Sequence, residues 1–117
     1  MFCGRTKAGA WMTARLTKLA AMLDADPTDA FVLYGLAQEH AKLDTPENQE
    51  RAVEFYDRCI AADGAYHYAY YHKAMSLIEL ERKDEAAATL RAGLTSAKGA
   101  RDQKASSELA ALLDQIT

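Results

Sequence analysis

YHYAYYHKAMSLIELERKDEAAATLRAGLTSAK, residues 66–98, is the stretch that decides the fold, because it contains two helices in succession. Over residues 66–81, apolar side chains recur at helical spacing along one side, at Tyr70, Ala74, Leu77 and Ile78. The polar run of residues 81–84 ends this stripe, and we expect Asp84 to cap the second helix. The small and apolar positions of that helix are Ala86, Ala87, Leu90, Gly93 and Leu94. Because the link is short, the two helices are predicted to pack as antiparallel neighbours.

A partial copy of this unit precedes it. In the second helix the copy lies 34 positions earlier, and the matching pairs are Ala52 with Ala86, Tyr56 with Leu90 and Cys59 with Gly93. The first helices match at 39 positions instead, pairing Phe31 with Tyr70 and Gly35 with Ala74. The first unit is therefore predicted to carry five extra residues within residues 43–51.

This pattern resembles the tetratricopeptide repeat family, whose unit is a helix–turn–helix of about 34 residues with large and small positions in a fixed series. In the resemblance, Phe31 or Tyr70 takes the family's first aromatic position. The family's closing proline is absent, since Gly64 and Lys98 stand at the ends of the two units. The resemblance implies an all-α fold, a right-handed α-solenoid of antiparallel helix pairs. It also implies protein or peptide binding without catalysis.

Two flanking helices are expected to cover the ends of the two pairs, because two units alone would leave apolar end faces exposed. Their stripes are Leu16, Leu19, Ala20 and Leu23 near the start, and Leu109, Leu112, Leu113 and Ile116 near the end. This gives six helices in a single domain over residues 12–117. The expected helices lie at residues 13–24, 30–42, 46–63 and 66–81, then from Asp84 and from Asp102 or a neighbour.

Helix ends are predicted from local signals. Thr28 or Asp29 and then Thr45, followed by Pro46, carry the side chains that favour a helix start. Gly64 is expected to end the third helix. Gly99 is expected to end the helix that starts near Asp84, in the left-handed conformation.

Residues 1–11 are interpreted as a flexible tail. They contain no continuous apolar block and therefore do not match a signal peptide. Met12 opens the periodic region and is predicted to be the natural start. The alternative is an ordered N-terminal arm anchored by Trp11.

Composition narrows the possible partners. The net charge is −3 and no basic run occurs, so nucleic acid is not expected to bind. No apolar run of about eighteen residues occurs, so no membrane span is expected. The two cysteines, Cys3 and Cys59, do not make a disulfide framework, and we expect a cytoplasmic protein.

No residue pattern predicts catalysis, a cofactor or a metal. His67 and His72 are five positions apart and so point about 140° away from each other on a helix. Cys59 aligns with Gly93, a small position at a helix contact, so it is interpreted as a core residue. The function is expected to be non-enzymatic.

The tyrosine-rich run at residues 66–71 contains more aromatic side chains than one core can take, so some are expected on the surface. The family's layout implies a concave face that two adjacent helices line. The expected partner-binding residues are Val32, Leu36, Glu39, His40, Tyr68, Tyr71, His72, Met75 and Glu79. A second possibility is that these side chains pack against the neighbouring cap helix or are simply solvated.

The favoured function is binding of a protein or peptide segment with Lys or Arg near its ends, because Asp29, Glu39 and Glu79 lie at the edges of this strip. The alternative is structural self-association, for example as a homodimer, through the tyrosines or an exposed helix face such as Leu109 or Leu113 of the last helix.

Overall fold

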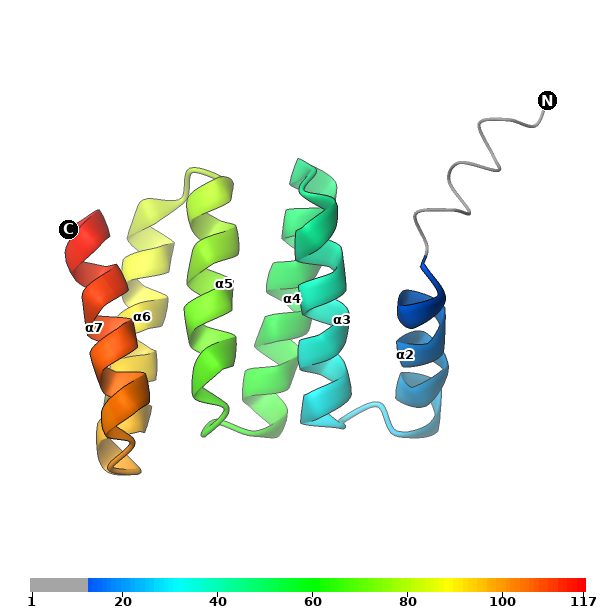
Figure 1. Cartoon of the computed structure of the whole chain (residues 1–117), viewed down its shortest axis with the longest axis horizontal. Coiled ribbons are helices and arrows are strands. Elements are labelled where there is room, and N and C mark those ends of the chain that lie inside the picture. Colours follow the sequence, from blue (N-terminus) through cyan, green and yellow to red (C-terminus); the bar gives the residue numbers. More distant parts are fainter. Residues whose placement is uncertain (1–12) are drawn as a thin grey trace.

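The computed structural model describes residues 13–117, which form six α-helices and no strand (Figure 1). The helices are α2 (Ala14–Ala25), α3 (Ala30–Leu43), α4 (Pro46–Ala62), α5 (His67–Glu79), α6 (Lys83–Gly99) and α7 (Gln103–Ile116). This confirms the prediction of an all-α solenoid. The expectations for the tail and for Met12 and Trp11 lie outside the described residues.

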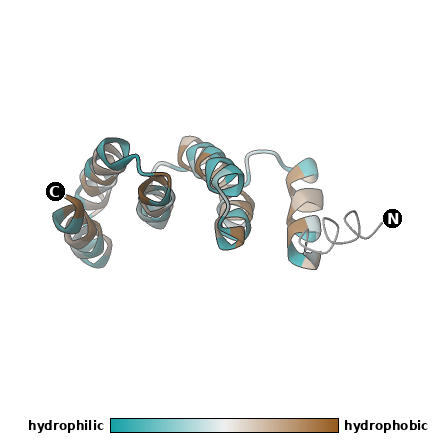
Figure 2. Cartoon of the chain, turned by 90° about the horizontal axis from the view of Figure 1, so that it is seen from above, coloured by the Kyte–Doolittle hydropathy of each residue, from teal (hydrophilic) through white to brown (hydrophobic). Residues whose placement is uncertain are grey.

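The helices pack mainly on their neighbours in the sequence. The pairs α3 with α4 and α5 with α6 form the two antiparallel units, α4 contacts α5 between them, and α2 and α7 lie at the ends. Seen from above in Figure 2, they form a staggered row. The result is an elongated body of 52 × 31 × 18 Å.

Four helices begin with a side-chain cap, and three of these starts, at Asp29, Thr45 and Asp102, were expected from the sequence. The side chains of Thr13, Asp29, Thr45 and Asp102 each accept a hydrogen bond from the backbone N–H three residues later. The prediction for Asp84 is wrong, because α6 already begins at Lys83. Asp84 instead lies in the first turn of α6, where its negative charge opposes the positive end of the helix dipole.

The glycine predictions hold for position but not for conformation. Helix α4 ends at Ala62, two residues before Gly64, and α6 ends at Gly99, but Gly99 is not left-handed as expected. No described glycine has a positive φ; the residues that do are Asp44, Glu81 and Arg101, at φ 49°, 60° and 60°. After α5, Glu81 donates its backbone N–H to Ile78 and Arg82 donates to Leu77. The same two bonds recur after α6, and this pattern places the left-handed residue two positions after the last helical residue, whatever its side chain.

The core shows that the first unit is aligned differently from the sequence-based match. Leu33 and Ala37 pack in one buried cluster with the α4 residues Ala52, Tyr56 and Cys59. Phe31, by contrast, is 64% exposed, and the nearest side chain to Gly35 is Leu19 of α2.

The first helices of the two units therefore match at 37 positions, pairing Leu33 with Tyr70 and Ala37 with Ala74. Ala37 and Ala74 are both completely buried. Ala37 precedes Ala52 by 15 positions and Ala74 precedes Ala86 by 12, so the insertion is three residues and not five. The pairing of Phe31 and Gly35 with Tyr70 and Ala74 is wrong because it followed residue type and not burial.

Candidate functional site

The nine expected site residues do not form one open strip. Val32 and Leu36 are 1% and 2% exposed and pack with Leu16 and Leu19 of α2 in a single cluster. The expectation that these two side chains lie on an open face is wrong, because α2 covers them.

Glu39 and His40 are also buried, and both join helices. The Glu39 carboxylate accepts hydrogen bonds from Arg15 Nε of α2 at 3.0 Å and from Lys42 Nζ at 2.9 Å. His40 Nδ1 lies 2.8 Å from Asn48 Oδ1, and its ring stacks on Phe55 with centroids 5.6 Å apart. These contacts hold α2 and α4 against α3, so neither side chain is free to meet a partner.

The five expected residues on α5 lie at or near the surface. Met75 is 44% exposed, Glu79 is exposed, and Tyr68, Tyr71 and His72 are half-buried. The Tyr68 hydroxyl donates a hydrogen bond to the Glu108 carboxylate on α7.

With the match at 37 positions, the α3 residues equivalent to this row are Phe31, Tyr34, Gln38 and Lys42. Their spacing places them on one side of α3, as the same spacing does for Tyr68, Tyr71, Met75 and Glu79 on α5. We call these eight residues the α3–α5 surface. Sequence reasoning missed its α3 half, because Gly35 and Ala37 are both small and only the exposure of Phe31 and the burial of Leu33 and Ala37 separate the two alignments.

Two residues of this surface, Tyr34 and Tyr71, belong to an aromatic cluster with Tyr56, Tyr66 and His72. Tyr34 lies 4.8 Å from Tyr66, 5.9 Å from Tyr56 and 6.0 Å from His72 between ring centroids, and Tyr71 lies 5.3 Å from His72. Burial raises the pKa of Tyr34 to about 12 and lowers the pKa of His72 below its usual 6.5. Tyr34 and His72 are therefore uncharged at neutral pH, and the packed rings fix the rows of α3 and α5 relative to each other.

A hollow of ≈ 330 Å³ opens between α3, α4 and α5 at the Lys42 end of this surface. Its lining residues are Gln38, Ala41, Lys42, Asp44, Gln49, Tyr56, His72, Met75, Ser76 and Glu79. Gln49 is 5% exposed, and its Nε2 donates to Ala41 O at 3.3 Å and to Asp44 Oδ1 at 2.9 Å. Its Oε1 is buried without a hydrogen-bond partner among residues 13–117.

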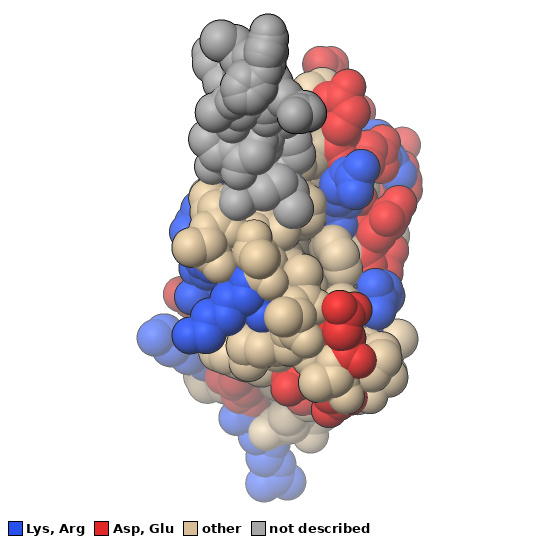
Figure 3. Space-filling view, turned by 90° about the vertical axis from the view of Figure 1, so that its right-hand side faces the viewer, with Lys and Arg blue, Asp and Glu red and all other residues tan. Residues whose placement is uncertain are grey.

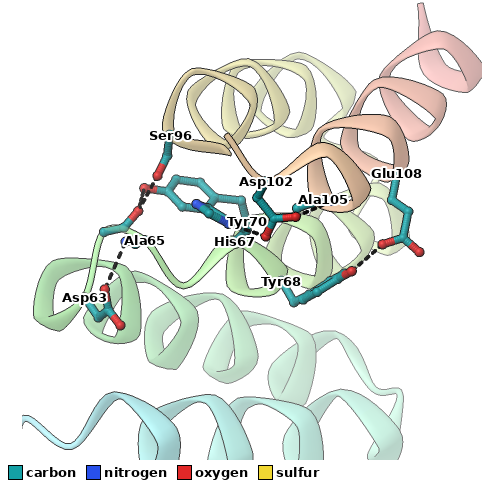
Figure 4. A network of polar contacts seen from close by, with 10 residues as sticks. Asp63, Ala65, His67, Tyr68, Tyr70, Ser96, Asp102, Ala105 and Glu108 are labelled. Atoms are coloured by element: carbon teal, nitrogen blue, oxygen red, sulfur yellow. Dashed lines mark hydrogen bonds and ion pairs between the residues drawn. The ribbon is translucent and has the colours of Figure 1, made fainter. Parts of the chain in front are cut away.

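At the other end, a polar network locks α5 to α6 and α7 (Figure 4). His67 Nδ1 lies 3.2 Å from Asp102 Oδ2, and the other Asp102 oxygen caps α7 through Ala105 N. The Tyr70 and Ser96 hydroxyls both donate to the Gly64 carbonyl, at 2.9 and 2.8 Å. Gly64 thus serves as an acceptor between the units.

The outer face of α7 differs from the expectation for self-association. Leu109 is 1% exposed, and Leu113 packs against the core of the second unit. Both side chains point inward, so the idea that they form an exposed apolar face is wrong.

Three further observations concern the reactivity of Cys59, metal binding and membrane spanning. Cys59 is fully buried, and burial raises its thiol pKa to about 11, which keeps the thiol protonated. Among the described residues, no three His, Cys, Asp or Glu side chains gather into a group that could hold a metal ion. None of the helices in residues 13–117 is both long enough and apolar enough to cross a membrane.

Comparison with known proteins finds a similar solved structure but no matching family model or curated protein. No family model matches the sequence, and no curated protein matches it. Among solved structures, the chain is similar to the crystal structure of a tetratricopeptide repeat domain protein from Salinibacter ruber, with 33% identity and a TM-score of 0.66. The match covers 75% of this chain and 94% of the other.

Proposed function

The chain belongs to the tetratricopeptide repeat family, and from this premise we propose that it is a non-enzymatic module that binds a peptide or protein segment on the α3–α5 surface. A repeat of helix pairs presents one row of side chains from each first helix, and such extended surfaces suit an extended or helical partner. Here the rows belong to α3 and α5.

The observation that carries the proposal is the exposure of large apolar side chains on these rows. Within residues 13–117, Phe31, Met75 and Met22 are the exposed large hydrophobics, and the first two belong to the α3–α5 surface. Tyr34 and Tyr71 lie one helical turn before Gln38 and Met75 in the same rows. Aromatic residues and methionine are enriched where proteins meet, because they bury much area with little loss of conformational freedom.

The rigidity of the rows adds to the argument. The ring packing of Tyr34 on Tyr66 and His72 and the Tyr68 hydrogen bond to Glu108 hold the surface in one arrangement before any partner arrives. A surface that needs no reordering on binding retains more of its contact energy as affinity.

A selection of short random peptides displayed on phage tests the proposal. Peptides enriched on the wild-type protein are measured against the double variant Phe31→Ala and Met75→Ala. Because both side chains are exposed, the fold stays intact while the affinity falls by about tenfold or more. Met22→Ala is the matched control, since Met22 of α2 is 43% exposed, Met75 is 44% exposed, and Met22 lies outside the surface.

The proposal fails if the selected peptides bind the double variant as tightly as the wild type. Loss of binding in Met22→Ala alone would move the binding site to α2.

One observation favours self-association as a second candidate. The side of α2 that faces away from α3 carries Met22 together with exposed alanines, and uncharged side chains cover the middle of this end of the molecule (Figure 3). Light scattering over a range of concentrations tests this candidate. A dimer that is lost in Met22→Ala would support it, whereas a monomer at every concentration would remove it.

A further inference from the structure

We infer that the hollow between α3, α4 and α5 is the specificity pocket of this surface and receives a Lys or Arg side chain of the bound segment. The inference rests on the proposed function, since the pocket lies at the Lys42 end of the α3–α5 surface. It adds the chemical class of the residue that the surface selects.

The size of the hollow suits one long side chain. At ≈ 330 Å³ it lies at the lower limit of the roughly 300–1,000 Å³ typical of small-ligand pockets. Met75 and Tyr56 line it with apolar atoms, which can cover the hydrocarbon stem of Lys or Arg while the charged head reaches polar groups.

Its polar lining is rich in acceptors. Asp44 and Glu79 both line the hollow, and neither carboxylate forms an ion pair with another residue of 13–117. The Asp44 carboxylate accepts one hydrogen bond, from the neutral amide of Gln49. Two uncompensated carboxylates favour a cationic group from a partner.

Gln49 supplies the second, independent observation. Its Nε2 already donates to two acceptors, which fixes the orientation of the amide and leaves Oε1 as the unpaired atom. A buried acceptor without a partner costs free energy, and Gln49 lines the hollow, so a donor that enters the hollow and reaches Oε1 would remove this cost. Lys and Arg carry only donors on their charged heads.

The aromatic residues of the lining add no positive charge that would repel this occupant. Tyr56 and His72 both line the hollow, their rings stack with centroids 6.4 Å apart, and burial keeps His72 uncharged at neutral pH by lowering its pKa.

Lys42 is the single cationic residue in the lining, and its positive charge repels a Lys or Arg side chain that enters the hollow. Its Nζ is bonded to Glu39 at 2.9 Å, but Glu39 also pairs with Arg15, so the charge of Lys42 is only partly compensated. A substitution at Lys42 can therefore distinguish a basic guest from an acidic one. Removing the Lys42 charge should strengthen the binding of a basic segment, whereas it would weaken the binding of an acidic one.

The test uses peptides selected from the random library on the full chain, resynthesised with each Arg replaced by its neutral analogue citrulline and each Lys by norleucine. We expect the selected peptides to share a basic residue, and the neutral replacement to lower affinity by about tenfold. Glu79→Gln and Asp44→Asn should lower affinity for the basic peptide by a similar factor, while Lys42→Gln should raise it. Glu54→Gln, which removes an exposed carboxylate of α4 outside the hollow, is the matched control and should change nothing.

The outcomes separate the two proposals. Peptides that depend on Phe31 and Met75 but tolerate the neutral replacement and Glu79→Gln would overturn the pocket and leave the surface in place. Acidic peptides that weaken with Lys42→Gln would also overturn it, in favour of an anionic guest. If no selected peptide depends on Phe31, Met75 or the pocket residues, both proposals fall.

Discussion

Gly93 lies at a close contact between the helices of the second unit. A Cβ at this position would lie 2.7 Å from Tyr70 Cβ, which sits close to the backbone and has little room to move. We therefore expect Gly93→Ala to lower the free energy of unfolding by about 1–3 kcal/mol, although alanine is the better helix former. Urea unfolding followed by circular dichroism measures the change.

Gly99→Ala is the control for Gly93→Ala, and it should act in the opposite direction. Gly99 is the last residue of α6 and has no positive φ, and a Cβ added there would meet no atom within 4 Å. Alanine should therefore raise the free energy of unfolding by about 0.4–1 kcal/mol. A loss of stability in Gly99→Ala would indicate that Gly99 has the left-handed conformation expected from the sequence.

His72 gives a prediction about pH. Burial lowers its folded-state pKa below the 6.5 of the unfolded chain, so the unfolded state takes up the proton first as the pH falls. Its contribution to stability is complete above about pH 6.5 and is lost as the pH falls through the folded-state pKa. We expect the wild type to lose more stability than His72→Phe between about pH 7.5 and 5.5. Equal losses in urea titrations of the two proteins would contradict a buried, neutral His72.

Helix α2 covers the apolar side of α3 at the end of the first unit. Leu19 packs on Val32 and Leu36, and its methyl groups lie 3.3 and 3.4 Å from where a Cβ at Gly35 would lie. Leu19→Ala should lower stability by about 2–5 kcal/mol.

Because each helix of a solenoid is held mainly by its neighbours, the loss should be local. Hydrogen exchange should speed up in α2 and in α3, while α5, α6 and α7 keep their protection. Equal loss of protection along residues 13–117 would show that α2 is not a separate cover.

Three helix starts could be predicted from the sequence, whereas the start of α6 and the conformation of the residues that end α5 and α6 could not. Asp29, Thr45 and Asp102 act through a hydrogen bond to a backbone N–H three residues later, so the signal is local. The ends after α5 and α6 are set by two backbone bonds across each link, which place Glu81 and Arg101 in the left-handed region. These bonds depend on how the next helix docks, and residue type does not reveal that.

Only the α5 half of the candidate site could be predicted from the sequence. The α5 row was found because its tyrosines and Met75 are unusual in the sequence itself. The α3 row was missed because Gly35 resembles the small position of the repeat, while the position is taken by Ala37. Only the burial of Ala37 and the exposure of Phe31 separate the two alignments, and both depend on where α2 and α4 pack.

The whole molecule is a short solenoid, 52 Å in its longest dimension, with different ends. At one end α7 turns Leu109 and Leu112 inward, and the residues on its outer side are mostly polar. At the other end α2 exposes Met22. Between the ends, α3 and α5 share the surface that we assign to partner binding.

The most direct test of that assignment is to map where a selected peptide binds on the isotope-labelled chain by nuclear magnetic resonance. The account predicts that the largest shifts of backbone amide signals cluster on α3 and α5, around Phe31, Gln38, Met75 and Glu79. Shifts concentrated instead on the outer face of α2 around Met22, or on the exposed side of α7, would contradict it.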